Sequence, residues 1–347
     1  MAELRDTELR AGIAGFGLAG EVFHAPLIGV TPGLRVSAVV TGNAERAERA
    51  GTRYPGVRVA ASVDELWDEI DLLVVAAPNR FHAELALAAI ERDVPVVIDK
   101  PIATSLADAE RIVGSGARVT VFQNRRWDGD FLTVRRMVES GAIGRVFRLE
   151  SRFDRFRPEI KSEWRESGDA GEGAGQLFDL GPHLIDQAIQ LFGPPVSVYA
   201  EIDRQRPGVE ADDDVFIALE HADGVRSHLH MGKVAPLAGP RFRVSGLGGG
   251  LAIDGLDPQE GQLKEGLVPG DEGYGERDPA RLTGLDGGSE SAPVETGAYG
   301  EFYAGVEAWI RSGGPPPVDP ADSILVMRVI EAARESDSDS RVVSFGP

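Results

Sequence analysis

The sequence predicts an α/β fold in two domains, and three observations lead to this prediction. The chain has 347 residues, which is long for one compact domain. Apolar runs alternate with helical patterns as far as Phe122, as in a doubly wound parallel sheet. Later strand-like runs follow one another, with helices collected between and after them. This second pattern indicates an α+β domain with a large, mostly antiparallel open sheet.

We expect the first domain to comprise residues 1–124 and the second residues 125–347. The strands expected in the first domain are Leu9–Ala14, Leu34–Val40, Leu72–Ala76, Val94–Ile98 and Val119–Phe122. Those expected in the second are Val146–Phe156, Val196–Ile202, Val215–Leu219, Arg226–Met231 and Arg241–Ser245. The helices expected are His82–Arg92, Leu106–Val113, Phe131–Ser140, Tyr299–Arg311 and Ala321–Ala333. We interpret Ser336–Ser340 as a polar surface segment and residues 255–298, which lack a period, as a flap or partly mobile loop.

Composition excludes several classes of function. The net charge of −20 argues against binding to nucleic acid, which needs clustered positive charge. The chain has no cysteine, so it has neither disulfides nor thiolate metal sites. No run approaches the roughly 20 apolar residues of a membrane span, and the N-terminus lacks the pattern of a signal peptide. We therefore expect a cytoplasmic protein without a membrane partner.

A glycine-rich loop follows the first expected strand. Gly15-Phe16-Gly17-Leu18-Ala19-Gly20 has the GxGxxG spacing, in which the glycines allow a tight turn, close approach of the backbone to a pyrophosphate and close helix packing. The pattern is weak alone, and a merely tight glycine turn is the alternative. Because it stands at the start of an alternating β/α series, we predict dinucleotide binding.

The end of the second strand bears on the choice between NADP and NAD. No acidic residue stands directly at the strand end to receive the ribose hydroxyls. Thr41 and Asn43 could instead bind a 2′-phosphate that Arg46 or Arg49 neutralises, which favours NADP. In the alternative interpretation the two arginines lie on an exposed helix face, and Thr41 and Asn43 bind a ribose.

Lys100 is the first candidate catalytic residue. The run Val96–Ile98 is typical of a buried parallel strand, and Asp99 and Lys100 follow where its carboxyl end opens into a crevice. Only four of the 36 basic residues are lysines. Unlike an arginine, a lysine can release a proton, so chemistry can require one at this place. The alternative is a solvated lysine after a strand.

Asp179 and His183 form the second candidate group. Gly181 and Pro182 are typical of a helix start, after which an apolar stripe continues to Phe192. Asp179 precedes the helix and His183 lies in its first turn at the rim of the stripe, so the two side chains can converge. A carboxylate orients an imidazole for general acid/base catalysis. The alternative is a capping aspartate and a structural histidine.

His228 and His230 alternate to one face of an expected strand, which is a spacing found in metal sites. No third ligand is evident in the sequence. We therefore predict ordinary sheet-face residues and no metal.

Several strings resemble the glucose-fructose oxidoreductase, inositol dehydrogenase and rhizopine catabolism (Gfo/Idh/MocA) family along nearly the whole chain. They resemble most the branch that holds the scyllo-inositol 2-dehydrogenases. The strings are 15–20, Val22–Pro26, Pro78-Asn79 with His82, Asp99–Pro101, Asn124–Asp128 with Asp130–Thr133, Trp164–Glu166, and Asp179–His183. The family usually has Glu where this chain has Asp99, and Pro182 replaces a residue that is often small and polar.

The resemblance implies roles for these residues. It implies that His183 exchanges the substrate proton, that Asp179 orients it and binds an adjacent hydroxyl, and that Lys100 binds the reacting oxygen. It further implies a nicotinamide held between the two domains, and a homodimer or homotetramer formed through the second domain's sheet. The expected cofactor contacts are Gly15, Phe16, Gly17, Leu18, Ala19, Gly20, Thr41, Asn43, Arg46, Pro78, Asn79, His82, Lys100, Asn124 and Arg125.

A polyol or sugar needs a pocket with paired donors and acceptors. The expected substrate contacts are Lys100, Trp127, Asp154, Arg157, Trp164, Asp179 and His183. Apart from Lys100, Asp179 and His183, each could instead be a domain-interface or fold residue.

Three hypotheses of function follow. The first is an NAD(P)-dependent dehydrogenase or reductase of a cyclitol or sugar hydroxyl, with scyllo-inositol and its 2-ketone as the leading pair. The second is a reductase of another carbonyl or imine on the same fold. The third is a cofactor-binding sensor or corepressor without turnover, against which the presence of Lys100, Asp179 and His183 together argues.

Overall fold

The computed structural model describes residues 8–160, 166 and 173–346, and the chain divides into two compact units. The first unit contains residues 1–127, 259–275 and 298–324, and the second contains 128–258, 276–297 and 325–347. Neither unit is continuous in sequence, whereas we expected one continuous segment for each. The interleaving arises because two downstream segments return to the first unit after the chain has begun the second.

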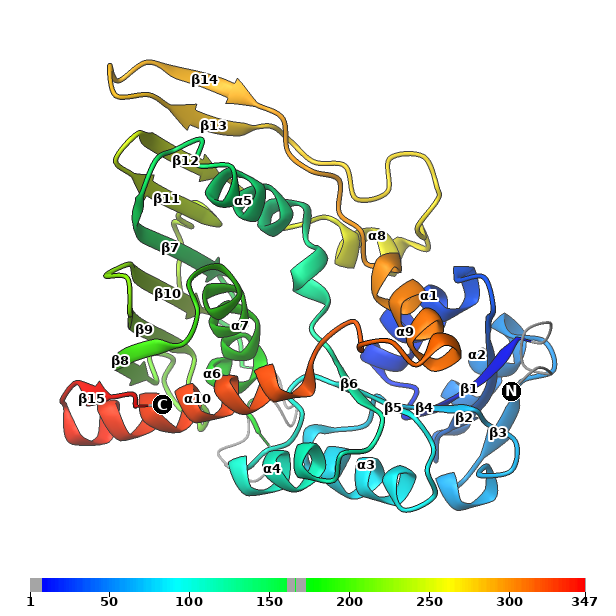
Figure 1. The fold of residues 1–347 in the computed structure, drawn as a ribbon. Coiled ribbons are helices and arrows are strands. Elements are labelled where there is room, and N and C mark those ends of the chain that lie inside the picture. Colours follow the sequence, from blue (N-terminus) through cyan, green and yellow to red (C-terminus); the bar gives the residue numbers. More distant parts are fainter. Residues whose placement is uncertain (1–7, 161–165, 167–172, 347) are drawn as a thin grey trace. The chain divides into compact units, whose positions relative to one another are not determined.

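The first unit is built on a six-stranded parallel sheet in the order β3-β2-β1-β4-β5-β6 (Figure 1). Its strands are β1 (Leu9–Ala14), β2 (Leu34–Val40), β3 (Arg58–Ala60), β4 (Leu72–Val75), β5 (Val96–Asp99) and β6 (Val119–Phe122). The order reverses between β1 and β4, so this sheet has its switch point beside the glycine-rich loop. Strand β4 is buried along its whole length, as expected of a parallel strand covered on both faces.

Helices cover both faces of this sheet. They are α1 (Ala25–Val30), α2 (Ala44–Arg53), α3 (His82–Ile90), α4 (Leu106–Gly114), α8 (Gln259–Glu265) and α9 (Gly300–Ser312). Short turns of other helix types are η2 (Ala19–His24), η3 (Val63–Glu65), η4 (Asn79–Phe81) and η5 (Asn124–Trp127). Helices α3 and α4 lie together on one face, and α1 and α9 lie on the other (Figure 1). Helix α9 thus belongs to the first unit although it comes late in the chain.

The second unit is built on a nine-stranded sheet in the order β14-β13-β12-β11-β7-β10-β9-β8-β15. Its strands are β7 (Val146–Asp154), β8 (Pro195–Asp203), β9 (Asp214–His221), β10 (Arg226–Gly232), β11 (Phe242–Gly246), β12 (Gly249–Ile253), β13 (Ala280–Thr283), β14 (Ser289–Ala292) and β15 (Val343–Ser344). Only β7 and β10 pair in parallel; the other pairings are antiparallel. Together the two sheets confirm the predicted fold class.

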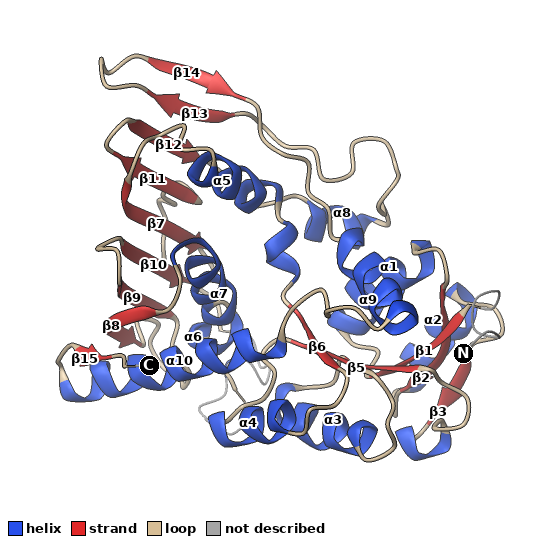
Figure 2. Ribbon diagram, in the orientation of Figure 1, coloured by secondary structure: helices blue, strands red, loops and turns tan. Residues whose placement is uncertain are grey.

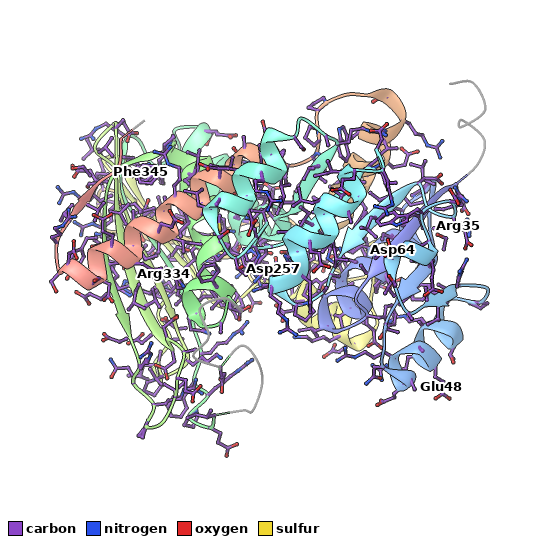
Figure 3. The ribbon with its side chains drawn as sticks, turned by 90° about the horizontal axis from the view of Figure 1, so that it is seen from below. Arg35, Glu48, Asp64, Asp257, Arg334 and Phe345 are labelled. Atoms are coloured by element: carbon purple, nitrogen blue, oxygen red, sulfur yellow. The ribbon has the colours of Figure 1, made fainter. Side chains whose placement is uncertain are left out.

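The helices that the structure describes in this unit lie on one face of the nine-stranded sheet (Figure 2). The helices are α5 (Gly129–Glu139), α6 (Gln176–Asp179), α7 (Gly181–Phe192) and α10 (Pro320–Asp339), of which α10 begins in the first unit. Strand β9 alternates buried and half-exposed residues, which is the pattern of a sheet with one covered face. Arg334 on α10, labelled in Figure 3, places its guanidinium over the ring of Phe178 at 4.6 Å.

The structure corrects two expectations for the second half of the chain. Residues 255–298, expected as a flap or mobile loop, contain α8 and the hairpin of β13 and β14. Short exposed strands such as Ser289–Ala292 have no apolar alternation, so the sequence gives no signal for them. Residues 336–339, expected in a polar surface segment, continue α10. Ser336 is fully buried there, and its hydroxyl accepts the amide of Ala200 at 3.0 Å.

Three charged side chains of the first unit, Arg35, Glu48 and Asp64, lie on its surface (Figure 3). Of the helices that the structure describes, none combines the length and the apolar character that crossing a bilayer requires.

Candidate active site

The glycine-rich loop joins β1 to η2, and two of its glycines are required by packing. Gly15 has a φ of +100°, and a Cβ there would lie 2.6 Å from the carbonyl oxygen of Ala76. A Cβ on Gly20 would collide with the carbonyl oxygen of Gly15. A π-helical turn, η2, follows at once, and turns of this kind are frequent at functional sites. The loop is therefore held tightly between β1 and β4.

Gly17 differs from the other two, because packing against the described residues does not require it. Among these residues, the nearest heavy atom to a Cβ there would be a guanidinium nitrogen of Arg46, at 3.8 Å. Open space above the backbone where a helical turn begins fits the close approach of a pyrophosphate. The residues present therefore fit a bound dinucleotide.

The two arginines expected near a 2′-phosphate differ in what they bind. Arg49 is held by Glu21, at 2.7 and 2.9 Å, and by Glu45, at 2.7 Å. For the Arg46 guanidinium, no ion pair is found among the described residues, and its backbone N–H donates to Asn43, the N-cap of α2. The backbone N–H of Asn43 in turn donates to the Thr41 hydroxyl at 3.3 Å. Of the two cations, Arg46 is the one available to an anion.

His82, expected beside the cofactor, holds two turns together. Its Nδ1 lies 2.7 Å from the carbonyl oxygen of Pro101, and its Nε2 lies 2.9 Å from that of Ala77. The ring is buried at the start of α3, after the 3₁₀ turn that begins with Asn79 and is capped by Pro78. Both ring nitrogens thus face backbone of the turns that follow β4 and β5, which fixes the shape of this edge of the sheet.

Lys100 follows β5 directly, at the carboxyl edge of the parallel sheet. Its backbone N–H donates to Asp99 Oδ1 at 2.9 Å, and the bond to Pro101 is cis. Strands β4 and β6 flank β5, so Lys100 emerges between the ends of two neighbouring strands. This is the edge at which ligands bind in open α/β sheets.

The sequence did not identify His24 as a functional candidate. It ends η2, is completely buried, and its Nε2 lies 4.0 Å from Asp99 Oδ1. Its Nδ1 lies 2.6 Å from the hydroxyl of Tyr303 on α9. Burial lowers the pKa of His24 to about 4, and burial, with Asp99 adding to it, raises the pKa of Tyr303 well above its usual value. The sequence feature that could have indicated a buried functional histidine is its position within the apolar run Val22–Ile28.

Asn124, Arg125 and Trp127 lie on η5, after β6. Asn124 and Arg125 are buried, and Arg125 donates to Glu260 on α8 at 2.9 Å. The Trp127 ring meets that of Phe302 edge to face at 5.7 Å. These contacts tie η5 to the returning segments of the first unit, so Arg125 and Trp127 have structural roles there in addition to any contact with a ligand.

Asp179 and His183 lie on either side of the junction between α6 and α7 in the second unit. Asp179 ends α6 and is partly exposed, and His183 in the first turn of α7 is 4% exposed. Leu180 lies between the helices and accepts the backbone N–H of His183 at 3.1 Å. Helix α7 is buried continuously from Gly181 to Ile189. The apolar stripe had suggested an exposed polar side, and the helix has none over these residues.

The remaining substrate candidates lie in the second unit at or after the end of β7. Asp154 ends β7, and its Oδ2 accepts the Gly239 amide at 3.2 Å. Arg157 is exposed, and its carbonyl oxygen accepts a hydrogen bond from Arg206. Trp164 lies outside the described residues. The assignment of these three residues to the substrate stays a prediction.

His228 and His230 lie on β10 and are half-buried. His230 stacks at a tilt on Phe216 at 4.8 Å, and burial, with Arg152 adding to it, lowers its pKa to about 4. Within the part of the chain that the structure describes, no three His, Asp or Glu side chains gather in a way that could hold a metal.

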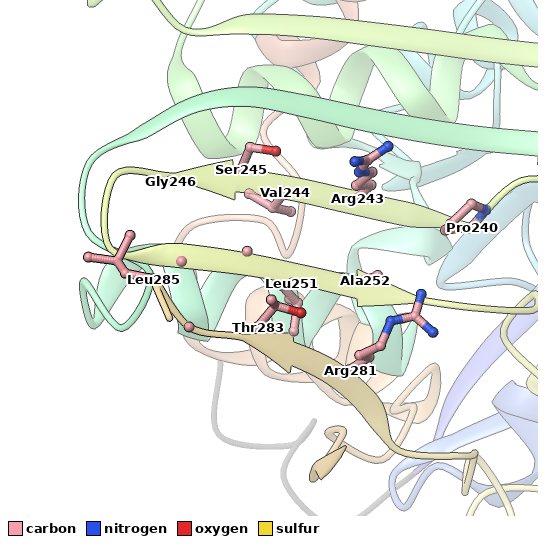
Figure 4. A pocket seen from close by; sticks show the side chains of 13 residues that line it. Pro240, Arg243, Val244, Ser245, Gly246, Leu251, Ala252, Arg281, Thr283 and Leu285 are labelled. Atoms are coloured by element: carbon pink, nitrogen blue, oxygen red, sulfur yellow. The ribbon is translucent and has the colours of Figure 1, made fainter. Parts of the chain in front are cut away.

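A cavity of about 550 Å³ opens on the second unit's sheet, over β11, β12 and β13 (Figure 4). Arg243 and Arg281 stand at one end of it and Leu285 at the other. None of Lys100, Asp179 and His183 lines this cavity. It is therefore separate from the candidate catalytic residues.

Two family models match the chain, one in each half. The model described as an oxidoreductase family with an NAD-binding Rossmann fold matches residues 9–121. The model described as a GFO/IDH/MocA C-terminal domain matches residues 131–252. The predicted dinucleotide-binding fold is thereby confirmed.

Known proteins are similar along almost the full length. The uncharacterized oxidoreductase YdgJ of Escherichia coli is 39% identical, over 94% of this chain and 96% of that protein. The scyllo-inositol 2-dehydrogenase (NADP(+)) IolW of Bacillus subtilis is 33% identical, over 96% and 95%. The solved structure of a putative oxidoreductase, yvaA, from Bacillus subtilis has a TM-score of 0.92 and 32% identity, over 98% and 99%. The chain belongs to the Gfo/Idh/MocA family of NAD(P)-binding oxidoreductases.

Proposed function

We propose that this enzyme is a dehydrogenase that oxidises a secondary hydroxyl of a cyclitol or sugar to a ketone, with NADP as the preferred cofactor and scyllo-inositol as the leading substrate. One observation carries the proposal: the similarity to an enzyme named scyllo-inositol 2-dehydrogenase (NADP(+)) extends over 96% of this chain. A D-apiose dehydrogenase of Rhizobium rhizogenes is 26% identical over 98% of the chain, which supports the broader class of polyol and sugar substrates.

The chemistry that we propose rests on three residues, Lys100, Asp179 and His183. A nicotinamide cofactor, if held by the glycine-rich loop, would supply the acceptor for the hydride that leaves the substrate carbon. His183 takes the hydroxyl proton as general base, and Asp179 orients the imidazole and binds an adjacent hydroxyl. Lys100 donates a hydrogen bond to the reacting oxygen, which stabilises the negative charge that develops there. In the reverse direction His183 returns the proton to the carbonyl oxygen.

The test of the function is a panel of initial rates. Purified enzyme is assayed with NADP and NAD against the inositol isomers and a set of aldoses. We expect turnover of scyllo-inositol or a close stereoisomer, with NADP favoured. If the enzyme turned over only another carbonyl or imine compound, that compound would replace cyclitols and sugars as the substrate class. Tight NADPH binding without turnover of any substrate at any pH would favour a sensor and overturn the proposal.

Replacing His183 by Ala tests the proposed base. We expect kcat to fall roughly 10²-fold or more, with the Kd of NADPH unchanged, because general acid/base catalysis contributes about that much. Stopped-flow kinetics and fluorescence titration measure the two quantities. A variant with the wild-type kcat would remove His183 from the mechanism.

Cofactor preference is tested by Arg46→Ala, with Arg49→Ala as the matched control. Arg46 has the guanidinium available to a 2′-phosphate, whereas Arg49 is held by Glu21 and Glu45. We expect Arg46→Ala to weaken NADPH binding about tenfold, a loss typical of one charge-assisted hydrogen bond, and to leave NADH binding unchanged. Arg49→Ala should not discriminate between the cofactors. An equal loss for both cofactors in Arg46→Ala would contradict the 2′-phosphate role.

We also propose that the enzyme is a homodimer or homotetramer that pairs through the uncovered face of the second unit's sheet. The helices of this unit lie on the other face (Figure 2). The uncovered side of β9 and β10 carries Phe216, His228 and His230, which are only half-exposed and pack on one another. Light scattering coupled to gel filtration tests the state, and a monomer at micromolar concentration would contradict it.

A further inference from the structure

The buried pair Tyr303 and His24, followed by the partly exposed Asp99, forms a polar series in the first unit that leads to Lys100. His24 and Tyr303 have no exposed surface, and the imidazole stacks at a tilt on Phe122 at 4.5 Å. The two residues are 279 positions apart in sequence, on η2 and α9. A polar pair buried this deeply is costly unless its hydrogen bonds are made, so its orientation is fixed by its partners.

The tautomer of His24 follows from the phenol. A buried Tyr303 that stays protonated must donate its hydrogen, and His24 Nδ1 at 2.6 Å is the partner within reach. Nδ1 is then the acceptor, and the neutral ring carries its hydrogen on Nε2. Tyr303 therefore presents the Nε2–H of His24 towards Asp99.

Asp99 lies at the end of this series and beside the candidate catalytic lysine. Its Oδ1 accepts the backbone N–H of Lys100 at 2.9 Å and is 4.0 Å from His24 Nε2. Within the described part of the chain, Nε2 has no hydrogen-bond partner, and Asp99 is the carboxylate nearest to it in an ion-pair contact. A separation of 4.0 Å is too long for a direct hydrogen bond, but at this distance a carboxylate still attracts the N–H dipole of the imidazole.

We propose that His24 is a positioning residue, whose Nε2–H, oriented by Tyr303, holds the Asp99 carboxylate and through it the turn that presents Lys100 to the substrate. This inference rests on the proposed function in one respect, namely that Lys100 assists the reaction. It adds two residues, His24 and Tyr303, that touch neither substrate nor reacting atoms.

A double-variant cycle tests whether His24 acts through Asp99. His24→Phe keeps an aromatic ring against Phe122, and Asp99→Asn removes the charge. We expect each variant to lower kcat roughly tenfold, because a small displacement of Lys100 from its catalytic position should slow the reaction by about this factor. The KM of the cofactor should stay unchanged. The double variant should be no slower than the slower single variant, since both changes break one series. The proposal would be overturned if the two losses in kcat multiplied in the double variant, or if His24→Phe kept the wild-type kcat.

A second measurement needs no substrate. The chain has only four lysines, so mass spectrometry can follow reductive methylation of Lys100 against Lys264 in the same sample. We expect His24→Phe to change the ratio of the two rates about fivefold, the factor that corresponds to about 1 kcal/mol. An unchanged ratio in folded protein would also overturn the proposal.

Tyr54→Phe is the matched control, and Tyr303→Phe is the substitute if His24→Phe fails to fold. Tyr54 also has a buried hydroxyl in the first unit, but it is not bonded to His24. We expect Tyr54→Phe to leave both kcat and the labelling ratio unchanged, whereas Tyr303→Phe should move both in the direction of His24→Phe. If the wild type turns over no substrate, the proposed function fails, while the labelling measurement still decides this inference.

Discussion

Two buried polar clusters, one in each unit, differ in charge. The cluster in the second unit is ionic: Asp130 is fully buried and pairs with Arg277 at 2.6 Å. Arg241, 2% exposed, lies 4.0 Å from the same carboxylate and donates to Gln187 at 2.7 Å. In the first unit the most deeply buried series, Tyr303 and His24, is neutral.

The difference sets how costly each cluster is to break. A buried ion pair is expensive to break, and this one joins α5 and α7 to the residue that precedes β11. Breaking a neutral pair leaves no uncompensated charge behind, so we expect it to cost less. Three predictions test this comparison, from the largest expected effect to the smallest.

Asp130→Asn should destabilise the protein most. The change leaves Arg277 and Arg241 buried without their counter-ion, and breaking a buried pair in this way costs about 3–5 kcal/mol. Urea unfolding measures the loss. The control is Asp254→Asn, which removes an exposed partner of Arg281 and should cost less than about 1 kcal/mol. Equal losses in the two variants would remove the distinction between buried and surface ions.

His24 should make stability depend on pH. Its pKa of about 4 in the folded state lies below the usual 6.5, so the unfolded state binds more protons between these values. Stability should fall as the pH falls from about 6.5 to about 4, by on the order of 3 kcal/mol for this residue. His24→Phe should lose that part of the slope in urea unfolding at several pH values. An unchanged slope would mean that the pKa of His24 does not differ between the folded and the unfolded state, and would contradict this prediction.

Ser336→Ala tests whether charge or burial sets the cost. Ser336 is a neutral buried group in the second unit, accepting the Ala200 amide and donating to the carbonyl oxygen of Arg341 at 2.6 Å. We expect a loss of about 1–2 kcal/mol, because a buried N–H is left unpaired. Thermal unfolding measures it. A loss of stability as large as that of Asp130→Asn would show that the cost depends on the unit in which a polar group is buried and not on its charge.

The sequence predicted most of the parallel sheet correctly because buried strands leave a strong signal. Leu9–Ala14, Leu34–Val40 and Val119–Phe122 are observed with the predicted bounds. Edge strands were missed: Arg58–Ala60 has two exposed residues of three, and Ser289–Ala292 has no buried residue. Such strands are held by their neighbours' backbone and not by their own apolar pattern.

The candidate site could be predicted only where a local pattern carries it. The glycine loop has a fixed spacing, and Lys100 ends an apolar run, so both could be found in one stretch of sequence. His24 depends on Tyr303 and Asp99, which are distant in sequence, and no local pattern links the three. The sequence also did not show which of Arg46 and Arg49 is available to an anion. That difference arises because Glu21, on a preceding turn, binds Arg49.

The return of residues 298–324 to the first unit has a consequence for synthesis on the ribosome. Tyr303 and Phe302 cover His24 and Phe122, so the N-terminal unit cannot be completed when residue 124 is made. At about 5–20 residues per second, the wait for α9 is roughly 10–40 seconds. During that time the strands of the second unit emerge while the nucleotide-binding sheet still lacks one of its covering helices. The first unit can therefore reach its complete packing only when α9, close to the end of the chain, has been made.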